Sequence, residues 1–268
     1  MLIDTHCHLH DREFFSEAQA EEMLRRAHEK GVEKIICIGT SHKDSLVAAE
    51  FAGSHENVYW TYGIHPEFAG REGKPLSRNV FGDGPNMERP KPVTTGLRER
   101  SEKGLSSRLV AIGEVGLDYH YDGYDRQAQI RLFEKMLQLA TDNNLPVSFH
   151  VREAFDDFFP VVANFPKIRG VVHSFSDNKK NLKRILNETD FYVGVNGMAT
   201  YSTLPTPPIE RILLETDAPF LTPKPFRGII NEPAYVPAIA KWLAAKLGLD
   251  YQIIERETTK NAEELFNI

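Results

Sequence analysis

Short apolar runs alternate with longer amphipathic segments along the chain, and this alternation restricts the possible folds more than any other feature. Eight runs have the length and apolar character of strands: Leu2–Asp4, Lys34–Ile38, Val58–Tyr62, Leu109–Gly113, Pro146–Phe149, Gly170–Val172, Phe191–Val193 and Arg211–Leu214. Segments between them have the apolar spacing of helices: Glu17–Lys30, Lys43–Ala52, Arg126–Asn143, Ala154–Ala163 and Asn178–Asn187. Strands that alternate with helices pair in parallel, so eight units predict an α/β fold of the (β/α)8 TIM-barrel type. The 268 residues are expected to form one domain, 1–268.

Residues that cap or stop helices mark several of the expected boundaries. Ser16 and Gln19 fit a capping box for the first helix, and Gly31 fits its C-terminal stop. After the seventh strand, residues 201–208 contain three prolines and leave little room for a full helix. Apolar spacing around Trp242 predicts an amphipathic helix near the C-terminus, and residues 262–266 predict a short last one.

One segment interrupts this rhythm between the third and the fourth strand. Residues 71–108 contain five Gly and four Pro and show no apolar period. They carry nine Arg or Lys and five Asp or Glu, so their net charge is +4 while the other 230 residues carry −10. Loops this long are usually functional or disordered. Because residues 71–108 follow the third strand and carry a positive charge, we predict that they form a loop that faces polyanionic substrates. The alternative is a solvated insertion without contacts.

Charge and apolar content restrict the partners and the compartment. The net charge of −6 does not indicate nucleic-acid binding, which usually shows as a basic excess, unless positive charge is concentrated locally. The N-terminus does not resemble a signal peptide, and no stretch approaches the ~20 apolar residues of a membrane helix. The two cysteines, Cys7 and Cys37, are expected to be buried thiols of a reducing compartment. We therefore expect a cytoplasmic monomer with no membrane or protein partner.

Residues of metal-ligand type follow five of the eight predicted strands. They are His6 and His8 after the first strand, Glu114 after the fourth, His150 after the fifth, His173 after the sixth and Asp217 after the eighth. In these barrels the loops after the strands form one shared mouth. Side chains that are far apart in the sequence are therefore expected to converge on one point.

The residue types at this point indicate a site for two cations. Side chains at i and i+2 of an extended segment point the same way, so His6 and His8 can face the mouth together while Cys7 points away. Imidazole and carboxylate ligands suit Zn, Mn, Fe or Co, whereas Mg prefers more oxygen ligands. Four histidines and two carboxylates exceed the three protein ligands of one catalytic zinc. A two-metal site is therefore predicted, with Glu114 as the natural bridge.

The other polar residues near the predicted mouth leave alternatives open. His65 could contact substrate or cap the turn before Pro66, and Arg152 could meet an anionic group or pair with a neighbouring acid. No G-x-S-x-G elbow, Walker motif or G-x-G-x-x-G is present, so the sequence gives no support to a serine nucleophile, a P-loop or a dinucleotide site. The remaining histidines are predicted to be solvated: His10, His28, His42, His55 and His120.

Six short motifs occur in the order that is typical of one enzyme family. They are DTHCHL at 4–9, GIHP at 63–66, AIGEVGLDY at 111–119, HVREAF at 150–155, HSFS at 173–176 and ETDAPFL at 215–221. With them the chain resembles the TatD family of metal-dependent deoxyribonucleases, within the amidohydrolase-like barrels. RGIINEPAYV at 227–236 is also similar to the family's segment after the last strand, so the resemblance spans nearly the whole chain.

The resemblance implies roles for the residues that match these motifs. His6, His8, Glu114 and Asp217 would surround one divalent cation, and Glu114, His150 and His173 would surround a second. The cations would be Mg²⁺, Mn²⁺ or Zn²⁺. Asp217 would also handle the proton of the attacking water, and His65 would approach the scissile phosphate.

The chain departs from the family pattern outside the metal site. The segment 71–108 is longer than usual, residues 201–208 are shorter, and Ile229 and Ile230 stand where the family often has basic residues. The first hypothesis is therefore a deoxyribonuclease that cleaves phosphodiester bonds of DNA with a two-metal-activated water. An amide, ester or lactone hydrolase with the same metal site is the alternative, because both reactions need similar water activation. A third hypothesis is a non-catalytic metal-binding scaffold, against which the complete ligand set argues.

Overall fold

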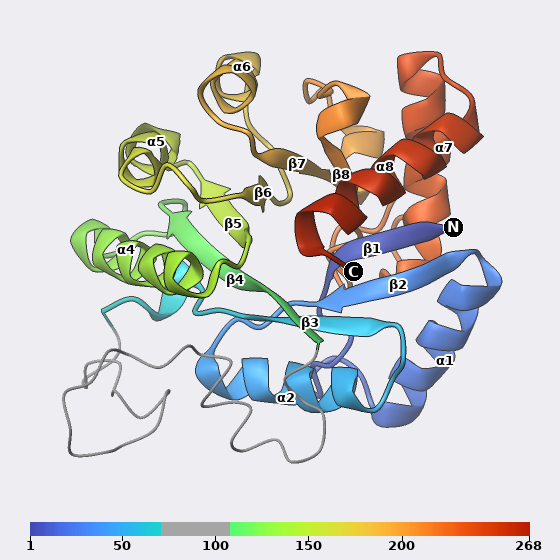
Figure 1. Ribbon diagram of the computed structural model, residues 1–268. Coiled ribbons are helices and arrows are strands. Elements are labelled where there is room, and N and C mark those ends of the chain that lie inside the picture. The colour runs from blue at the N-terminus through green and yellow to red at the C-terminus, as the bar shows by residue number, and fades with distance from the viewer. Residues whose placement is uncertain (71–107) are drawn as a thin grey trace.

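Eight parallel strands form a barrel in the computed structural model, which describes residues 1–70 and 108–268. The strands are hydrogen-bonded in chain order: β1 (Leu2–Cys7), β2 (Val32–Cys37), β3 (Val58–Tyr62), β4 (Leu109–Asp118), β5 (Val147–Arg152), β6 (Gly170–Val172), β7 (Tyr192–Val195) and β8 (Ile212–Leu214). Figure 1 shows the helices outside the strands and the first strand beside the last. The predicted (β/α)8 fold is confirmed.

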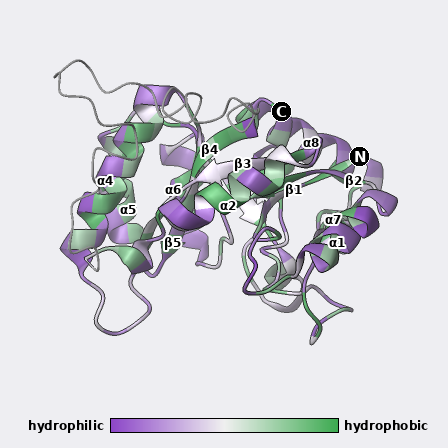
Figure 2. Cartoon of the chain, turned by 90° about the horizontal axis from the view of Figure 1, so that it is seen from below, coloured by the Kyte–Doolittle hydropathy of each residue, from purple (hydrophilic) through white to green (hydrophobic). Residues whose placement is uncertain are grey.

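The helices that surround the barrel are α1 (Glu17–Glu29), α2 (His42–Gly53), α4 (Arg126–Asn143), α5 (Phe155–Ala163), α6 (Lys179–Glu188), α7 (Val236–Leu247) and α8 (Tyr251–Phe266). Short 3-10 turns are η1 (Pro66–Phe68), η4 (Gly197–Tyr201), η5 (Ile209–Arg211) and η6 (Pro233–Tyr235). Figure 2 shows hydrophobic and hydrophilic residues alternating around helices such as α1 and α4, as expected for helices with one buried face. Among the described helices, none combines the length and the apolar character needed to cross a membrane.

The barrel closes between β8 and β1 through a seam with little regular strand pairing. A single bridge joins Cys7 to Ala218. The buried carboxylate of Asp4 accepts hydrogen bonds from the Thr216 amide at 2.9 Å and from the Thr216 hydroxyl at 2.6 Å. Thr5 donates from its own hydroxyl to the carbonyl of Leu214 at 3.0 Å. Side-chain hydrogen bonds therefore replace part of the ladder at this seam.

The predicted helix boundaries agree with the observed caps. Ser16 and Gln19 form the capping box that begins α1, and Gly31 follows the helix with φ of +80°. Helix α4 spans Arg126–Asn143 as expected, with the Asp125 side chain capping its first turn. The last helix is longer than predicted, because α8 begins at Tyr251 after the left-handed Gly248 has ended α7.

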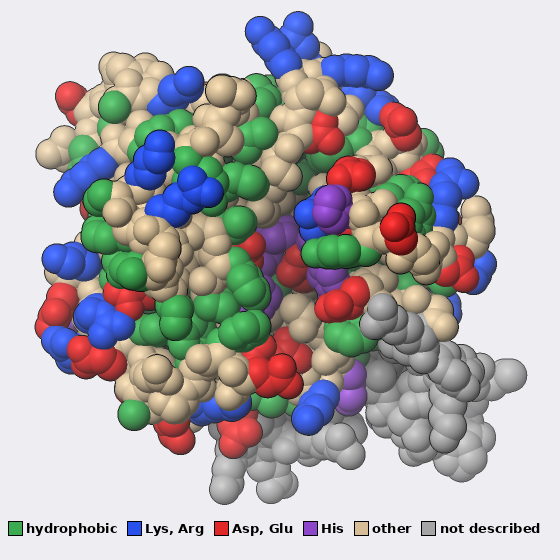
Figure 3. All heavy atoms as spheres, turned by 180° about the vertical axis from the view of Figure 1, so that it is seen from behind, with side chains coloured by type: hydrophobic (Ala, Val, Ile, Leu, Met, Phe, Trp, Pro, Cys, Tyr) green, Lys and Arg blue, Asp and Glu red, His purple; other side chains and the backbone are tan. Residues whose placement is uncertain are grey.

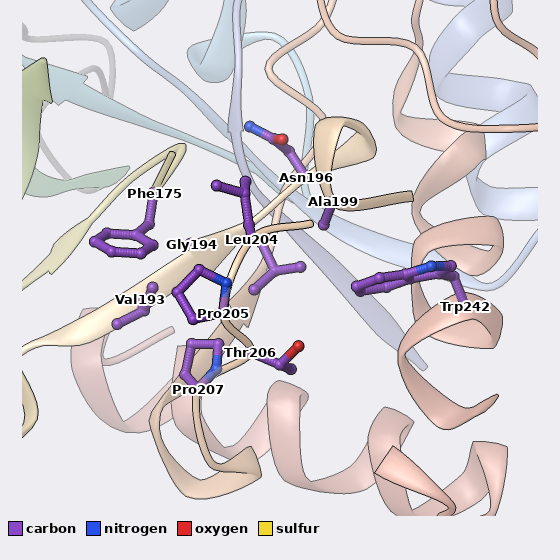
Figure 4. Close-up of a pocket in the computed structure, with 11 residues that line it drawn as sticks. Phe175, Val193, Gly194, Asn196, Ala199, Leu204, Pro205, Thr206, Pro207 and Trp242 are labelled. Atoms are coloured by element: carbon purple, nitrogen blue, oxygen red, sulfur yellow. The ribbon is translucent and has the colours of Figure 1, made fainter. Parts of the chain in front are cut away.

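The unit after β7 lacks a full helix, as the three prolines predict. The turn η4 and an extended segment replace the helix. Trp242 of α7 lies across a small cavity from this segment (Figure 4). A mainly apolar cavity of about 20 Å³ remains there, which is room for about one water molecule. Its lining contains none of the residues expected to bind metal, so the cavity is a packing feature of this shortened unit.

Four strands continue further toward the mouth than predicted. Strand β1 reaches Cys7, β4 reaches Asp118, β5 reaches Arg152 and β7 reaches Val195. The reason is pairing between neighbours, since Gly116 pairs with His150. His6, Glu114 and His150 therefore lie within strands instead of following them.

Two further expectations concern buried polar groups and the insertion. Both cysteines are buried free thiols, as predicted. The prediction that His10 is solvated is wrong, because its side chain is fully buried and its Nε2 lies 3.0 Å from Asp44 Oδ1. The segment predicted to be a substrate-facing loop, 71–108, lies outside the described residues except for Arg108, whose guanidinium donates to the carbonyl of Ala52.

Candidate metal centre

The six predicted ligands, contributed by five strands or the turns after them, come together at the mouth of the barrel. Figure 3 shows histidine and acidic side chains in a hollow on one face of the molecule. Four of the six are buried, with His6 0% and Glu114 4% exposed, and His150 and Asp217 are partly exposed toward the hollow. Polar atoms that are buried together in this way need partners that satisfy them.

The first group of ligand atoms lies beside the closing seam. Nitrogen or oxygen atoms of His6, His8 and Glu114 lie within 4.8 Å of one another. Asp217 joins this group, because its Oδ1 lies 3.6 Å from the Nε2 atoms of both His6 and His8. The amide of Asp217 donates to the carbonyl of His6 at 2.8 Å, so the seam itself fixes this group.

The second group lies around the other carboxylate oxygen of Glu114. His150 Nδ1 is 2.6 Å and His173 Nε2 is 2.7 Å from Glu114 Oε1, and the two imidazole nitrogens are 3.4 Å apart. In the first group His6 Nε2 lies 3.5 Å from Oε2 of the same glutamate. The two carboxylate oxygens of Glu114 therefore face different groups, as a bridging ligand requires.

The neutral state of His6 and the free lone pairs of the two histidines in the first group fit a cation there. His6 Nε2 is buried without a hydrogen-bond partner. Burial and the charge of His173 lower the pKa of His6 to about 4, so this imidazole is neutral at pH 7. The Nδ1 of His8 lies 3.1 Å from the carbonyl of Ile38, and donating to it leaves the Nε2 lone pair directed into the group. Imidazole and carboxylate donors of this kind suit divalent transition metals.

His65 lies at the edge of the same site. Its Nε2 is 3.8 Å from Glu114 Oε1, and its ring centroid is 4.5 Å from that of His150. The amide of Glu67 donates to His65 Nδ1 at 3.3 Å. Burial and repulsion from His150 lower the pKa of His65 to about 4, so the neutral ring carries its proton on Nε2. Of the two alternatives for His65, the structure shows the cap of the turn η1, and contact with substrate stays a prediction.

Close approach of the backbone at Gly63 brings β3 and β4 together at this edge. A Cβ on Gly63 would overlap the backbone of Gly113 and Glu114. The amide of Glu114 donates to the carbonyl of Gly39 at 2.7 Å, and the amide of His65 donates to the carbonyl of Thr40 at 2.7 Å. The glycine of the GIHP motif therefore gives Glu114 and His65 their relative positions.

The sequence analysis missed Asp118, which acts on the second group. Its Oδ2 lies 2.9 Å from His150 Nε2, and its Oδ1 accepts from the amide of His120 at 3.0 Å. Gln129 of α4 holds the backbone of Asp118 with two hydrogen bonds of 2.8 Å. Asp118 thus accepts a hydrogen bond from the protonated Nε2 of His150, and the Nδ1 lone pair of that ring stays free for a cation. Its spacing from Glu114 could have predicted this position, because residues i and i+4 of one strand lie on the same face.

Glu215, which the sequence analysis also missed, has the corresponding position behind His173. The Oε1 of this fully buried carboxylate lies 3.9 Å from His173 Nδ1 and accepts from the amide of Ser174 at 2.6 Å. Its space exists because residue 194 is glycine, where a Cβ would overlap the carboxylate. Burial raises the pKa of Glu215 to about 8. The ETD motif thus supplies two acids, one in the ligand set and one behind it.

Comparisons with known proteins cover nearly the whole chain. The family profile described as "TatD related DNase" matches residues 3–267. The "uncharacterized metal-dependent hydrolase YabD" of Bacillus subtilis is 30% identical, with 100% of both chains covered. The "3'-5' ssDNA/RNA exonuclease TatD" of Pantoea ananatis is 32% identical over 92% of this chain and 93% of its own. Among solved structures, the TatD homologue YjjV of Escherichia coli superposes with a TM-score of 0.84 at 27% identity, covering 100% of this chain and 98% of that one.

Proposed function

Because this chain belongs to the family of TatD-related DNases and is a metal-dependent hydrolase, we propose that it cleaves phosphodiester bonds of DNA. One observation carries the proposal: Glu114 lies between two groups of buried ligand atoms and offers each group one carboxylate oxygen. A pair of cations about 3.5–4 Å apart is the arrangement that nucleases and phosphatases use for phosphoryl chemistry. We assign His6, His8, Glu114 and Asp217 to one cation, and Glu114, His150 and His173 to the other.

Different residues of the site have different roles in hydrolysis. Two divalent cations, when bound, would lower the pKa of water from 15.7 toward about 7 and stabilise the charge on the attacking and leaving oxygens. Asp217 accepts the proton that the water loses, since its Oδ1 lies beside both histidines of the first group. His65 donates from Nε2 to an oxygen of the scissile phosphate and so orients the substrate.

The choice of DNA has support beyond the metal site. The Pantoea relative, at 32% identity, carries a name that specifies an exonuclease of single-stranded DNA and of RNA, which favours a nucleic acid over a carbonyl substrate. The net charge of +4 on residues 71–108 supplies local cations in a chain whose total charge is −6, and phosphate binding depends on such local charge. The ligand atoms alone would also activate water toward an amide, ester or lactone, so substrate assays decide between these reactions.

The test compares substrates and metals in one experiment. Protein stripped with chelator is assayed with single-stranded and duplex DNA, RNA, and a panel of amides, esters and lactones. Mg²⁺, Mn²⁺ or Zn²⁺ is then added back. We expect DNA cleavage that requires added metal, and anomalous diffraction should show two peaks within about 4 Å. Full activity in excess chelator, or metal-dependent hydrolysis of a carbonyl substrate without DNA cleavage, would refute the proposal.

A further inference from the structure

Exposed apolar side chains concentrate around the mouth of the barrel. The described part of the chain has eight large apolar side chains that are exposed, and two of them, Met1 and Leu46, lie elsewhere. The other six follow the carboxyl ends of strands, in the loops after β1, β4 and β8: Phe14, Tyr121, Tyr124, Phe220, Ile229 and Ile230. Apolar side chains that gather in this way beside a site are typical of ligand contacts.

Two of these side chains form a pair next to the first group of ligands. Phe14 is 46% exposed and Phe220 is 48% exposed, and their rings meet edge to face with centroids 5.3 Å apart. Phe220 is three residues beyond Asp217, and its amide donates to the carbonyl of Asp217 at 2.8 Å. Phe14 follows His8 through a turn in which the amide of Asp11 donates to the carbonyl of His8 at 3.0 Å.

The backbone under both rings is held in place by buried anchors. The side-chain amide of Asn231, which is fully buried, donates to the carbonyls of Phe220 and Thr216. Phe15, the neighbour of Phe14, is 1% exposed and belongs to the core. The exposure of Phe14 and Phe220 is therefore imposed by well-anchored loops and is not a result of loose chain.

The charge in the loop of Phe220 suits a polyanion, whereas the loop of Phe14 carries Asp11 and Glu13 beside Arg12. Between Ala218 and Asn231 the charged residues are Lys224 and Arg227, both exposed and both cationic. Phosphates bind to such groups, whereas an aromatic face binds a base. The loop after β8 thus carries one exposed ring and two positively charged side chains, a few residues from Asp217, the proposed proton acceptor.

From this arrangement we propose that Phe14 and Phe220 form a stacking subsite for one unpaired base of the nucleic acid beside the scissile phosphate. The inference rests on the proposed function and adds the residues that select single strands. Stacking needs a base with a free face, which a single strand or a frayed end offers and a closed duplex does not. Every base has such a face, so the subsite discriminates by strandedness rather than by sequence.

The test couples a change in the protein to a change in the substrate. Phe220→Leu and Phe14→Leu keep an apolar side chain but remove the ring, and Phe220→Trp restores a larger ring. Each variant is assayed for kcat/KM, and for binding by fluorescence anisotropy, on single-stranded oligonucleotides in which one abasic position is moved along the strand. Leu46→Ala removes an exposed apolar side chain outside the pair and serves as the matched control.

We expect Phe220→Leu to weaken binding and lower kcat/KM by at least about 5-fold, the lower end of losses at stacking aromatics. An abasic site at one position should lower the kcat/KM of the wild type by a similar factor, and should lower that of Phe220→Leu little further. Phe220→Trp should keep wild-type values. Additive losses at every abasic position, or a lowered melting temperature with unchanged kcat/KM, would overturn the subsite while leaving the nuclease proposal intact. If the wild type neither binds nor cleaves any oligonucleotide, both proposals fall.

Discussion

Replacing Asp118 by asparagine should weaken cation binding at the group of Glu114, His150 and His173. Asp118 Oδ1 is engaged by the amide of His120, so the asparagine oxygen stays on that side. The new amide nitrogen then faces His150 Nε2, which lies 2.9 Å from the present Oδ2. A donor at this position favours the tautomer with the proton on Nδ1, the nitrogen that faces Glu114. That tautomer cannot bind a cation through Nδ1.

Loss of such an outer partner typically costs 10- to 100-fold in metal affinity, which corresponds to about 1.4–2.7 kcal/mol. We expect the affinity for one of the two cations to fall by at least about 10-fold. Titration calorimetry of chelator-stripped protein with Mn²⁺ or Zn²⁺ measures the affinities of the two sites separately. Asp142→Asn, an exposed change on α4, serves as the control. A variant whose two affinities both stay within twofold of wild type would show that Asp118 does not orient His150.

Two further predictions concern the reaction and the substrate. Asp217→Asn should reduce turnover on DNA by at least ~10²-fold at saturating metal, the lower end of what a positioned base contributes, with little change in melting temperature; near-wild-type turnover would exclude Asp217 as the proton acceptor. Replacing residues 71–108 by a short Gly-Ser linker should lower DNA affinity and flatten its dependence on salt, because fewer phosphates are neutralised. An unchanged affinity and salt slope in that variant would assign no DNA contact to the insertion.

The repeat of strands and helices was sufficient to predict the barrel, because each unit carries its own periodicity. The strand ends were harder to predict, since they depend on partners in neighbouring strands. The pairing of Gly116 with His150 extends β4 and β5 beyond the apolar runs that the sequence shows. A pattern read along one segment contains no information on such a partner.

The candidate site was predictable to the extent that its residues follow strands in recognisable motifs. His6, Glu114 and Asp217 converge because parallel strands end at the same side of a barrel. Asp118 and Glu215 were missed because each lies beside a histidine of another strand, and the sequence of one strand does not show which histidine that is. The burial of His10 could not be predicted, because it depends on how the loop after β1 meets Asp44.

The seam between β1 and β8 has a consequence for the order in which the protein acquires activity. His6 and Asp217 are hydrogen-bonded neighbours there, although 211 positions separate them in the chain. During translation the first two histidines leave the ribosome early, and their partner follows only after most of the polypeptide has been made. A nascent or C-terminally truncated chain without β8 and the turn after it therefore lacks Asp217, one of the four residues assigned to the first cation. If Asp217 acts as proposed, we expect hydrolase activity to appear only when synthesis is nearly complete.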